Sequence, residues 1–269
     1  MKNMNIIILG VNADIGLNIC KYYLKSGATI IGTYRKKKPN INVSLYKKNL
    51  KFVKCDITNP LDLIKLKNFI IRHKFKWNLI FSSVGTSEPI GRFFSINFKN
   101  WEKSVNVNMI SQLKTIHKLY PLRNKNKICN IALLAGGGTN NPMRCYSAYC
   151  VSKIALIKMC ELIYDENKDL NIFILGPGFT RTKSHLETLK AGSKAELNYL
   201  KVKKFWESGS QGTDFKEIFD CMDWCIKIGP KTTSGRNISV VHDNWGTVGL
   251  KKRLRKDNDM YKLRRYKNK

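Results

Sequence analysis

The sequence lacks a long apolar segment. Its first apolar run, Ile6 to Leu9, is far too short to cross a bilayer, and it lacks the small-residue cleavage site of a signal peptide. The sequence also lacks internal repeats and a recognisable linker. A chain of 269 residues, 43% of them apolar, can bury one sizeable core. We therefore expect a single domain in the cytoplasm, without a membrane span.

Metal-binding patterns are also missing. The chain has eight cysteines but no CxxC pair and no His/Cys spacing typical of a metal site. Several cysteines lie inside apolar patterns, and Cys221 and Cys225, four positions apart in an expected helix, form the only near-pair. We interpret all eight as buried or incidental thiols and expect no metal ion.

Acidic residues are scarce. The chain carries 19 of them against 49 lysines and arginines, a formal net charge of +30. Such an excess suits a partner that bears phosphates, whether nucleotide, nucleic acid or membrane surface. Much of it, however, is lysine spread along the chain with abundant asparagine and isoleucine, a mixture that an AT-rich coding sequence would also produce. Only residues 251–269 are densely basic, and we expect them to form a solvated or flexible tail.

Short apolar runs alternate with stretches whose apolar residues recur at three-and-four spacing. This alternation predicts an α/β fold: a Rossmann-type, doubly wound parallel sheet in a domain over 1–250, with helices on both faces and ligands beyond the carboxyl ends of the strands. Residues 183–213 have weak periodicity and glycine breaks, so we expect a lid there. The runs predict strands at 5–10, 28–34, 51–57, 78–85, 127–134, 171–178 and 237–243. The other stretches predict helices at 15–26, 60–73, 101–120, 147–166 and 214–228.

The first expected strand leads into the first expected helix through the residues GVNADIG. Gly10 would sit at a tight turn, and Gly16 where the helix must approach the sheet closely. Around Asn12, Asp14 and Ile15, backbone N–H groups and the positive end of the helix would face a pyrophosphate. A merely structural glycine turn is the alternative.

This turn resembles the T-G-x-x-x-G-x-G motif of the short-chain dehydrogenase/reductase family, with Leu9 and Asp14 departing from it. A carboxylate close to a pyrophosphate would repel it, so we expect the Asp14 side chain to point outward or to cap the helix. The resemblance extends from about residue 4 to about residue 245, and it implies a nicotinamide dinucleotide cofactor.

The second expected strand ends in TYRKKK, where the adenosine ribose of the cofactor would lie. Arg35 would pair with a 2′-phosphate, whereas an acidic side chain would accept hydrogen bonds from a free 2′-hydroxyl. We therefore expect NADP in preference to NAD. The resemblance implies that Asp56, followed by Ile57, holds the adenine. A helix cap is the other interpretation of Asp56.

Further motifs follow in the family's order. FSSVG stands where the family has N-N-A-G, so Ser83 and Gly85 would line the cofactor site. WEKSVNVN resembles the helix that carries the family's active-site asparagine, here Asn108. YCVSK is the Y-x-x-x-K signature and holds Tyr149 and Lys153. PGFTRT matches P-G-x-x-x-T, whose residues at the nicotinamide end would be Pro177, Gly178, Phe179 and Thr182.

The resemblance implies an NAD(P)-dependent oxidoreductase. Tyr149 would donate a proton to a carbonyl oxygen as hydride reaches its carbon. Lys153 lies one helical turn away, so both side chains share one face of the helix. Its ammonium would lower the pKa of the tyrosine and hold the nicotinamide ribose. Asn108 would hold Lys153 through a water molecule.

One catalytic group of the family is absent from its usual place. The family's serine, which hydrogen-bonds the same carbonyl, comes shortly before the tyrosine, where this chain has Ala135, Gly136 and Gly137. Thr139 could reach back, because glycine permits backbone shapes that other residues cannot adopt. A backbone N–H of the glycine run, or Ser147, is a second candidate. In a third interpretation, the protein binds cofactor but turns over little.

Segments such as AGGGTNNP and GPGFTRTKSH resemble a subset of the family associated with surface-polysaccharide biosynthesis. That resemblance implies a sugar or nucleotide-activated sugar as substrate, with reduction of a small ketone or aldehyde as the family-wide alternative. Relatives commonly dimerise or tetramerise through long helices, so we expect a homo-oligomer. The rival from another class is a binder of nucleic acid or membrane surfaces through the basic tail, although we expect no specific nucleic acid.

Overall fold

The computed structural model describes residues 4–41, 46 and 48–265. Its centre is a seven-stranded sheet in the order β3-β2-β1-β4-β5-β6-β7, and every neighbouring pair is parallel. The order reverses between β1 and β4, so ligands are expected beyond the carboxyl ends of these strands. The predicted doubly wound sheet is confirmed. The strands are β1 (Asn5–Leu9), β2 (Thr29–Tyr34), β3 (Leu50–Lys54), β4 (Leu79–Ser82), β5 (Cys129–Leu134), β6 (Leu170–Gly176) and β7 (Asn237–Ser239).

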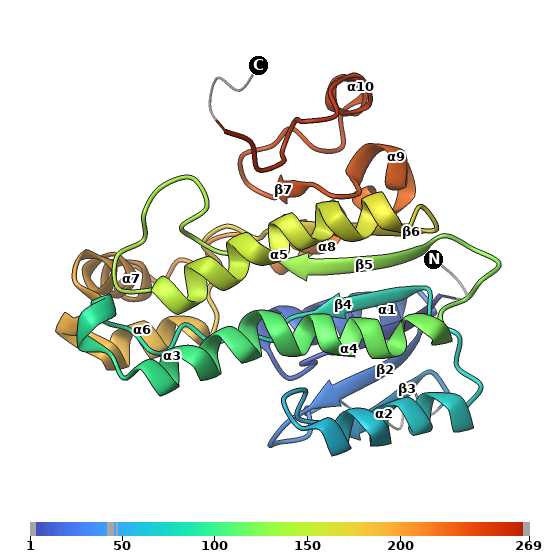
Figure 1. Ribbon diagram of the computed structural model, residues 1–269, viewed down its shortest axis with the longest axis horizontal. Coiled ribbons are helices and arrows are strands. Elements are labelled where there is room, and N and C mark those ends of the chain that lie inside the picture. The colour runs from blue at the N-terminus through green and yellow to red at the C-terminus, as the bar shows by residue number, and fades with distance from the viewer. Residues whose placement is uncertain (1–3, 42–45, 47, 266–269) are drawn as a thin grey trace.

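Helices lie on both faces of this sheet (Figure 1). The longer helices are α1 (Asp14–Lys25), α2 (Pro60–Arg72), α3 (Phe98–Val105), α4 (Ser111–Leu119), α5 (Ser147–Glu166), α6 (Ser184–Ala191), α7 (Leu197–Glu207), α8 (Phe215–Ile228) and α10 (Val248–Lys256). The short ones are η2 (Phe93–Ser95), η3 (Asn106–Ile110), η4 (Tyr120–Leu122), η5 (Gly192–Ala195) and α9 (Pro230–Thr233).

Strand β1 shows how the two cores form. Successive side chains of a strand point to opposite faces. Ile6 and Ile8 pack in the core that contains α1 and α8, while Ile7 and Leu9 pack in the core that contains α2, α4 and α5. All four are 0% exposed. Because both faces are covered, the strands need apolar residues on both sides, which explains their continuous apolar runs.

The helix predicted at 101–120 is interrupted. The segments α3 and α4 join through η3, a π-helical turn. Such turns inside α-helices are frequent at functional sites. This one contains Asn108, whose side chain is completely buried.

The C-terminal segment is docked on the domain. Helix α10 buries Leu250 and Leu254 completely against the core. The guanidinium of Arg236 donates to the carbonyl oxygen of Leu254 at 2.7 Å. Residues 251–265 are therefore docked on the domain and not a flexible tail, because the two leucines, four positions apart, form an apolar face among the basic residues. Most of these residues are nevertheless exposed, as expected for a solvated segment. Residues 266–269 lie outside the described part of the chain.

All eight cysteines are free thiols and all are buried, as predicted. Cys221 and Cys225 lie on α8 within the core. In the described part of the chain, no helix combines the length and apolarity needed to cross a bilayer.

Candidate active site

The loop between β1 and α1 leaves backbone donors available. Gly10 has a φ of +72°, a left-handed conformation that suits glycine, and its carbonyl oxygen accepts a hydrogen bond from the Ala13 N–H at 2.9 Å. A Cβ atom at Gly16 would lie 2.3 Å from the Ser83 hydroxyl oxygen, so glycine is required for this close approach. The N-cap residue Ala13 offers no side-chain acceptor to the first turn of α1. The N–H groups of that turn can therefore bind an anion.

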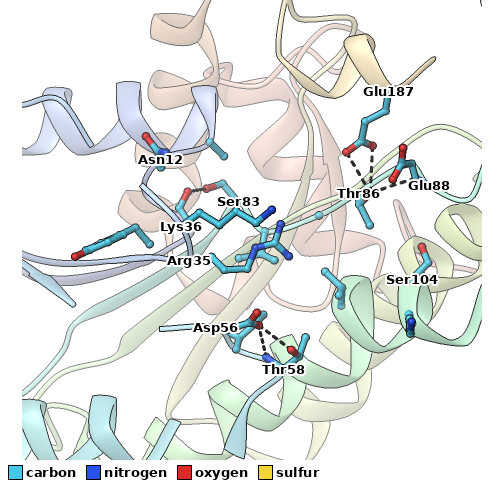
Figure 2. A pocket seen from close by; sticks show the side chains of 18 of the residues that line it. Asn12, Arg35, Lys36, Asp56, Thr58, Ser83, Thr86, Glu88, Ser104 and Glu187 are labelled. Atoms are coloured by element: carbon cyan, nitrogen blue, oxygen red, sulfur yellow. Dashed lines mark hydrogen bonds between the residues drawn. The ribbon is translucent and has the colours of Figure 1, made fainter. Parts of the chain in front are cut away.

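A cavity of about 910 Å³ opens beside this turn. This volume falls within the range of about 300–1,000 Å³ that is typical of ligand pockets. Arg35 and Lys36 extend into it from the end of β2 (Figure 2). Seven residues predicted to bind cofactor line the cavity: Gly10, Asn12, Arg35, Asp56, Ile57, Ser83 and Gly85.

The other predicted residues do not form the wall of this cavity. Among the residues that the structure describes, those outside the wall are Asp14, Ile15, Gly16, Asn108, Thr139, Tyr149, Lys153, Pro177, Gly178, Phe179 and Thr182.

Asp56 has one carboxylate oxygen fixed by its own loop. Its Oδ1 accepts hydrogen bonds from the Thr58 N–H at 3.0 Å and from the Thr58 hydroxyl at 2.8 Å (Figure 2). The N-cap of α2 is Asn59, whose side chain accepts from the Leu61 N–H. The interpretation of Asp56 as the helix cap is therefore wrong, and the carboxylate is held in the cavity wall instead.

The two serines that replace the family's amides bond within the protein. The Ser82 hydroxyl donates to Gln112 Oε1 at 2.6 Å, and the Ser83 hydroxyl donates to the Gly10 carbonyl oxygen at 2.9 Å. They tie the end of β4 to α4 and to the phosphate-binding turn.

Behind Gly85, the cavity wall meets the predicted lysine and asparagine. A Cβ atom on Gly85 would lie 3.3 Å from Asn108 Oδ1 and 3.9 Å from Lys153 Nζ. The Asn108 side chain accepts from the Thr86 N–H and donates to the Thr86 carbonyl oxygen, each at 2.9 Å. Lys153 Nζ donates to the Leu134 carbonyl oxygen at 2.8 Å. Burial lowers the pKa of Lys153 to about 8.

Tyr149 lies on α5 with its hydroxyl against the glycine run. A Cβ atom on Gly136 would lie 2.2 Å from this hydroxyl oxygen, so a side chain at position 136 would collide with the tyrosine. Lys153 Nζ lies 5.6 Å from the centroid of the Tyr149 ring. Burial raises the pKa of Tyr149 to about 12, with smaller contributions from Cys150 and Glu187. The expectation that Lys153 lowers this pKa is wrong for the chain alone, because the loss of water around the phenol dominates.

The two hydroxyls considered as replacements for the missing serine have different partners. Thr139 Oγ1 donates to the Gly136 carbonyl oxygen at 3.4 Å, next to the residue that Tyr149 contacts. Ser147 Oγ accepts from Trp101 Nε1 at 3.0 Å. Thr139 is therefore bonded to the glycine run itself, whereas Ser147 is bonded to α3.

The chain turns sharply after β6. Gly178 has a φ of +75°, and a Cβ atom there would lie 2.4 Å from both Thr213 Oγ1 and Val241 Cγ2. The Pro177 carbonyl oxygen accepts a hydrogen bond from the Thr180 hydroxyl at 3.3 Å. This turn directs the chain into the segment that we expected to be a lid.

The lid segment, residues 183–213, contains α6, η5 and α7 and returns to its starting point. An antiparallel bridge joins Thr180 to Gly212. The Phe179 ring packs on Phe205 of α7, with centroids 4.5 Å apart, and on His185 of α6, at 4.6 Å. The lid segment therefore begins and ends at the same place in the fold, and aromatic contacts join its helices to Phe179.

Asp14 bonds to the start of the lid segment. Its Oδ2 accepts from the Lys183 N–H at 2.6 Å, and its Oδ1 lies 3.3 Å from Lys183 Nζ. The expectation that this carboxylate caps α1 is wrong, because Ala13 is the N-cap residue and the Asp14 oxygens face the start of α6. Asp14 does not line the cavity.

Sequence reasoning missed Glu187, which lies on α6 and lines the cavity. Its carboxylate accepts from the Thr86 hydroxyl at 3.2 Å (Figure 2). It also accepts from the Ser87 N–H at 2.6 Å. Burial raises its pKa. The sequence signal that could have identified it is that Glu187 is the single acidic residue in the basic stretch KSHLETLK.

Fold and site together define a nucleotide-binding α/β protein, since the open phosphate turn, the cavity and Arg35 fit a dinucleotide. A family model described as short chain dehydrogenase matches residues 4–191. The chain therefore belongs to the short-chain dehydrogenase family, whose members use NAD or NADP.

Individual relatives are distant. An uncharacterised oxidoreductase of Schizosaccharomyces pombe is 25% identical over 195 residues, which cover 71% of this chain and 77% of that protein. Short-chain dehydrogenase reductase 3a of Arabidopsis thaliana is 27% identical over 105 residues, 38% of this chain and 41% of that protein. The chain thus matches about two fifths of the length of that relative. The crystal structure of a Saccharomyces cerevisiae short-chain dehydrogenase/reductase has a TM-score of 0.80 at 19% identity and covers 92% of this chain and 98% of its own. This likeness shows the fold.

Proposed function

We propose that the protein is an oxidoreductase that transfers a hydride between NADP(H) and a carbonyl or hydroxyl substrate. The observation that carries this proposal is the convergence of Lys153 and Asn108 behind Gly85, which itself belongs to the wall of a cavity that begins at the phosphate-binding turn. Tyr149 lies one helical turn from Lys153 on α5. A protonated tyrosine beside a nucleotide site suits carbonyl reduction, which needs a proton donor.

The bound cofactor would supply the hydride. Tyr149 keeps its proton across the neutral range, because its pKa is raised to about 12, and would donate it to the carbonyl oxygen of the substrate. Lys153 has a pKa lowered to about 8, so it is charged near neutral pH. With cofactor and substrate bound, its ammonium would favour the phenolate left behind. Asn108 fixes the Thr86 backbone, and Gly85 leaves space in front of the lysine.

The residues that would hold the cofactor lie partly in the wall of the cavity and partly outside it. The turn from Gly10 to Gly16, with Asn12 and Ile15, would bind the pyrophosphate, and Asp56 with Ile57 would hold the adenine. Ser83 and Gly85 would line the middle, and Pro177, Gly178, Phe179 and Thr182 the nicotinamide end.

NADP is proposed in preference to NAD because of the side chains at the end of β2. Arg35, Lys36 and Lys37 all line the cavity and are exposed. No carboxylate of the described residues forms an ion pair with any of them. Their charge is therefore available to a 2′-phosphate.

Thr139 is proposed as the donor that replaces the family's serine. Removing one such donor lowers kcat by about 100-fold or more, so Thr139→Val should show that loss with little change in NADPH affinity. Thr139→Ser should restore the rate, and Ser147→Ala is the matched control. A Thr139→Val enzyme with unchanged kcat would assign the role to Ser147 or to a backbone N–H of the glycine run.

A sugar or nucleotide-activated sugar, as in surface-polysaccharide biosynthesis, is the proposed substrate. Lys103, Lys190 and Lys194 also line the cavity, which supports an anionic ligand. A small ketone or aldehyde is the alternative. A screen of both classes with NADPH and NADH separates them.

The decisive experiment measures cofactor binding and then turnover. Tyr149→Phe should lose about 1,000-fold in kcat/KM while NADPH binding is kept, since the variant lacks only the acid/base hydroxyl. Tyr164→Phe, on the same helix, is the control. Unchanged activity in Tyr149→Phe would refute the mechanism. NADPH binding without oxidation by any substrate would favour the low-turnover interpretation.

Association through the basic C-terminal segment is the rival function, and the exposed face of α10 is the observation that favours it. Lys252, Arg253 and Lys256 are exposed there. Deleting residues 251–269 would also remove the buried Leu254, so Lys252→Glu combined with Lys256→Glu is the cleaner variant. Salt-dependent binding to RNA or anionic vesicles that this variant loses would support the rival.

We also propose a homo-oligomer in the cytoplasm. Ile110, Val151 and Leu162 are 48%, 44% and 43% exposed, and they lie on the long helical segments expected to pair. Eight buried free thiols suit a reducing compartment. Light scattering on the purified chain tests the assembly, and a monomeric mass would refute it.

A further inference from the structure

We infer that Asp14 is a positioning residue that anchors the lid helix α6 to the phosphate-binding turn, and that Lys183 neutralises its charge there for an anionic ligand. The second half of this inference depends on the proposed function, because it concerns cofactor binding. The first half concerns the protein alone.

The contact joins two segments that are far apart in the sequence. Lys183 is the N-cap residue of α6, and the helix has no side-chain cap. Its N–H donates to Asp14 Oδ2 at 2.6 Å, across a separation of 169 residues. Asp14 thus supplies a carboxylate acceptor at the start of α6, where the helix dipole also favours negative charge.

A second carboxylate also holds this helix. Glu187, one turn further along α6, accepts from the Ser87 N–H at 2.6 Å and from the Thr86 hydroxyl at 3.2 Å. The Tyr146 and Thr188 hydroxyls lie 2.7 Å apart. Helix α6 is therefore bound to the loops after β1 and β4, whose residues line the proposed cofactor cavity.

The ammonium of Lys183 acts on the charge of Asp14 and not on the anchoring of α6. The ion pair spans 3.3 Å, with the Asp14 side chain 21% exposed and the Lys183 side chain 69% exposed, so its direct effect on stability is small. Asp14 is, however, the first residue of α1, in the turn whose N–H groups would bind phosphates. Without Lys183 the carboxylate would repel an anion there, because a like charge opposes binding.

The two roles separate by substitution. Asp14→Gly, which restores the residue of the family's motif, removes both the anchor and the negative charge. Lys183→Ala removes the ammonium but keeps the backbone N–H bond. Asp14→Asn keeps an acceptor oxygen for that N–H and removes the charge, so it also serves if the glycine variant does not fold.

Hydrogen exchange on the ligand-free protein tests the anchor. Asp14→Gly should raise amide exchange across residues 184–191 by about tenfold, because the acceptor of the Lys183 N–H is lost. Asp14→Asn and Lys183→Ala should stay close to the wild type, and Lys201→Ala, a lysine of α7, is the control. Unchanged exchange in Asp14→Gly would overturn the anchor, whether or not any cofactor binds.

NADPH titration tests the neutralisation. Lys183→Ala should weaken NADPH binding by about five- to tenfold, as expected for an uncompensated nearby charge. In the Asp14→Asn background the same lysine substitution should have no effect. Equal losses in both backgrounds would overturn the charge argument and make Lys183 a direct phosphate contact. If the wild type itself binds no NADPH, the proposed function fails while the exchange result still decides the anchor.

Discussion

The two ends of the site are built differently. At the phosphate-binding turn, donors are left open: Ala13 gives α1 no side-chain cap, and Arg35 stands exposed in the cavity. At the catalytic end, the groups already have partners, because Lys153 Nζ donates to the Leu134 carbonyl oxygen and the Tyr149 hydroxyl packs on Gly136. The proposed nucleotide end thus presents groups that can bind a ligand, whereas the groups at the catalytic end are held by contacts within the chain.

Burial explains the electrostatic side of this difference. It raises the pKa of Tyr149 to about 12 and lowers that of Lys153 to about 8. The directions are opposite because a phenol becomes charged when it loses its proton, whereas an ammonium is charged while it keeps it. At the catalytic end burial therefore shifts both groups toward their neutral forms, although Lys153 is still charged near neutral pH.

Filling the gap in the glycine run should have a large effect on activity. Gly136→Ser would restore a hydroxyl near the family's usual position, but its Cβ would lie 2.2 Å from the Tyr149 hydroxyl oxygen. We expect kcat/KM to fall by about 100-fold, because a catalytic group displaced by about 1 Å loses that much rate. Steady-state kinetics with NADPH measures it.

Gly137→Ala is the matched control for this substitution. Its Cβ would meet the end of the Met143 side chain, at 2.7 Å from Sδ, which can move aside. A Gly136→Ser enzyme as active as the wild type would show that the tyrosine is free to move, and that the catalytic end is as open as the nucleotide end.

The next effect is on stability. Lys153→Met removes a buried ammonium, so we expect the free energy of unfolding to rise by about 1 to 3 kcal/mol at neutral pH, after allowance for the lost bond to Leu134. Activity should be lost in the same variant. Urea unfolding of the ligand-free proteins measures the first effect, and Lys158→Met, an exposed lysine on the same helix, is the control.

The pH dependence of that difference identifies its cause. Burial lowers the pKa of Lys153 in the folded chain to about 8, below the ordinary value of 10.5 expected in the unfolded chain. Between these pH values the unfolded chain binds more protons than the folded chain. The stability of the wild type therefore rises with pH relative to that of Lys153→Met. The advantage of Lys153→Met should be complete below pH 8 and shrink toward pH 10.5. A stability difference that does not change with pH would mean that packing alone causes it.

The smallest expected effect is on NADPH binding at the proposed nucleotide end of the site. Arg35→Ala should weaken NADPH binding by about tenfold and leave NADH binding unchanged, because an exposed arginine loses one charge-assisted contact to the 2′-phosphate. Lys38→Ala is the control, since that ammonium lies 5.7 Å from the Phe52 ring centroid. Equal losses for the two cofactors would argue against NADP preference.

Much of the fold was predictable because its signals are local. The strands end within a few residues of the predicted runs, and α5 matches its predicted limits of 147 and 166. The spacing of Tyr149 and Lys153 places both on that helix. The break of the helix at 101–120 by η3 was not predictable, since a π turn leaves no pattern in apolar spacing.

The sequence by itself determined the order of strands and helices, the phosphate-binding turn and the candidate catalytic pair, because each depends on residues a few positions apart. The tertiary structure decided the contact of Asp14 with Lys183, that of Glu187 with Thr86 and the packing of Tyr149 on Gly136. It also decided that the pKa of Tyr149 is raised and that the pKa of Lys153 is lowered. These depend on burial and on partners up to 169 residues away, which only the packed fold brings within reach.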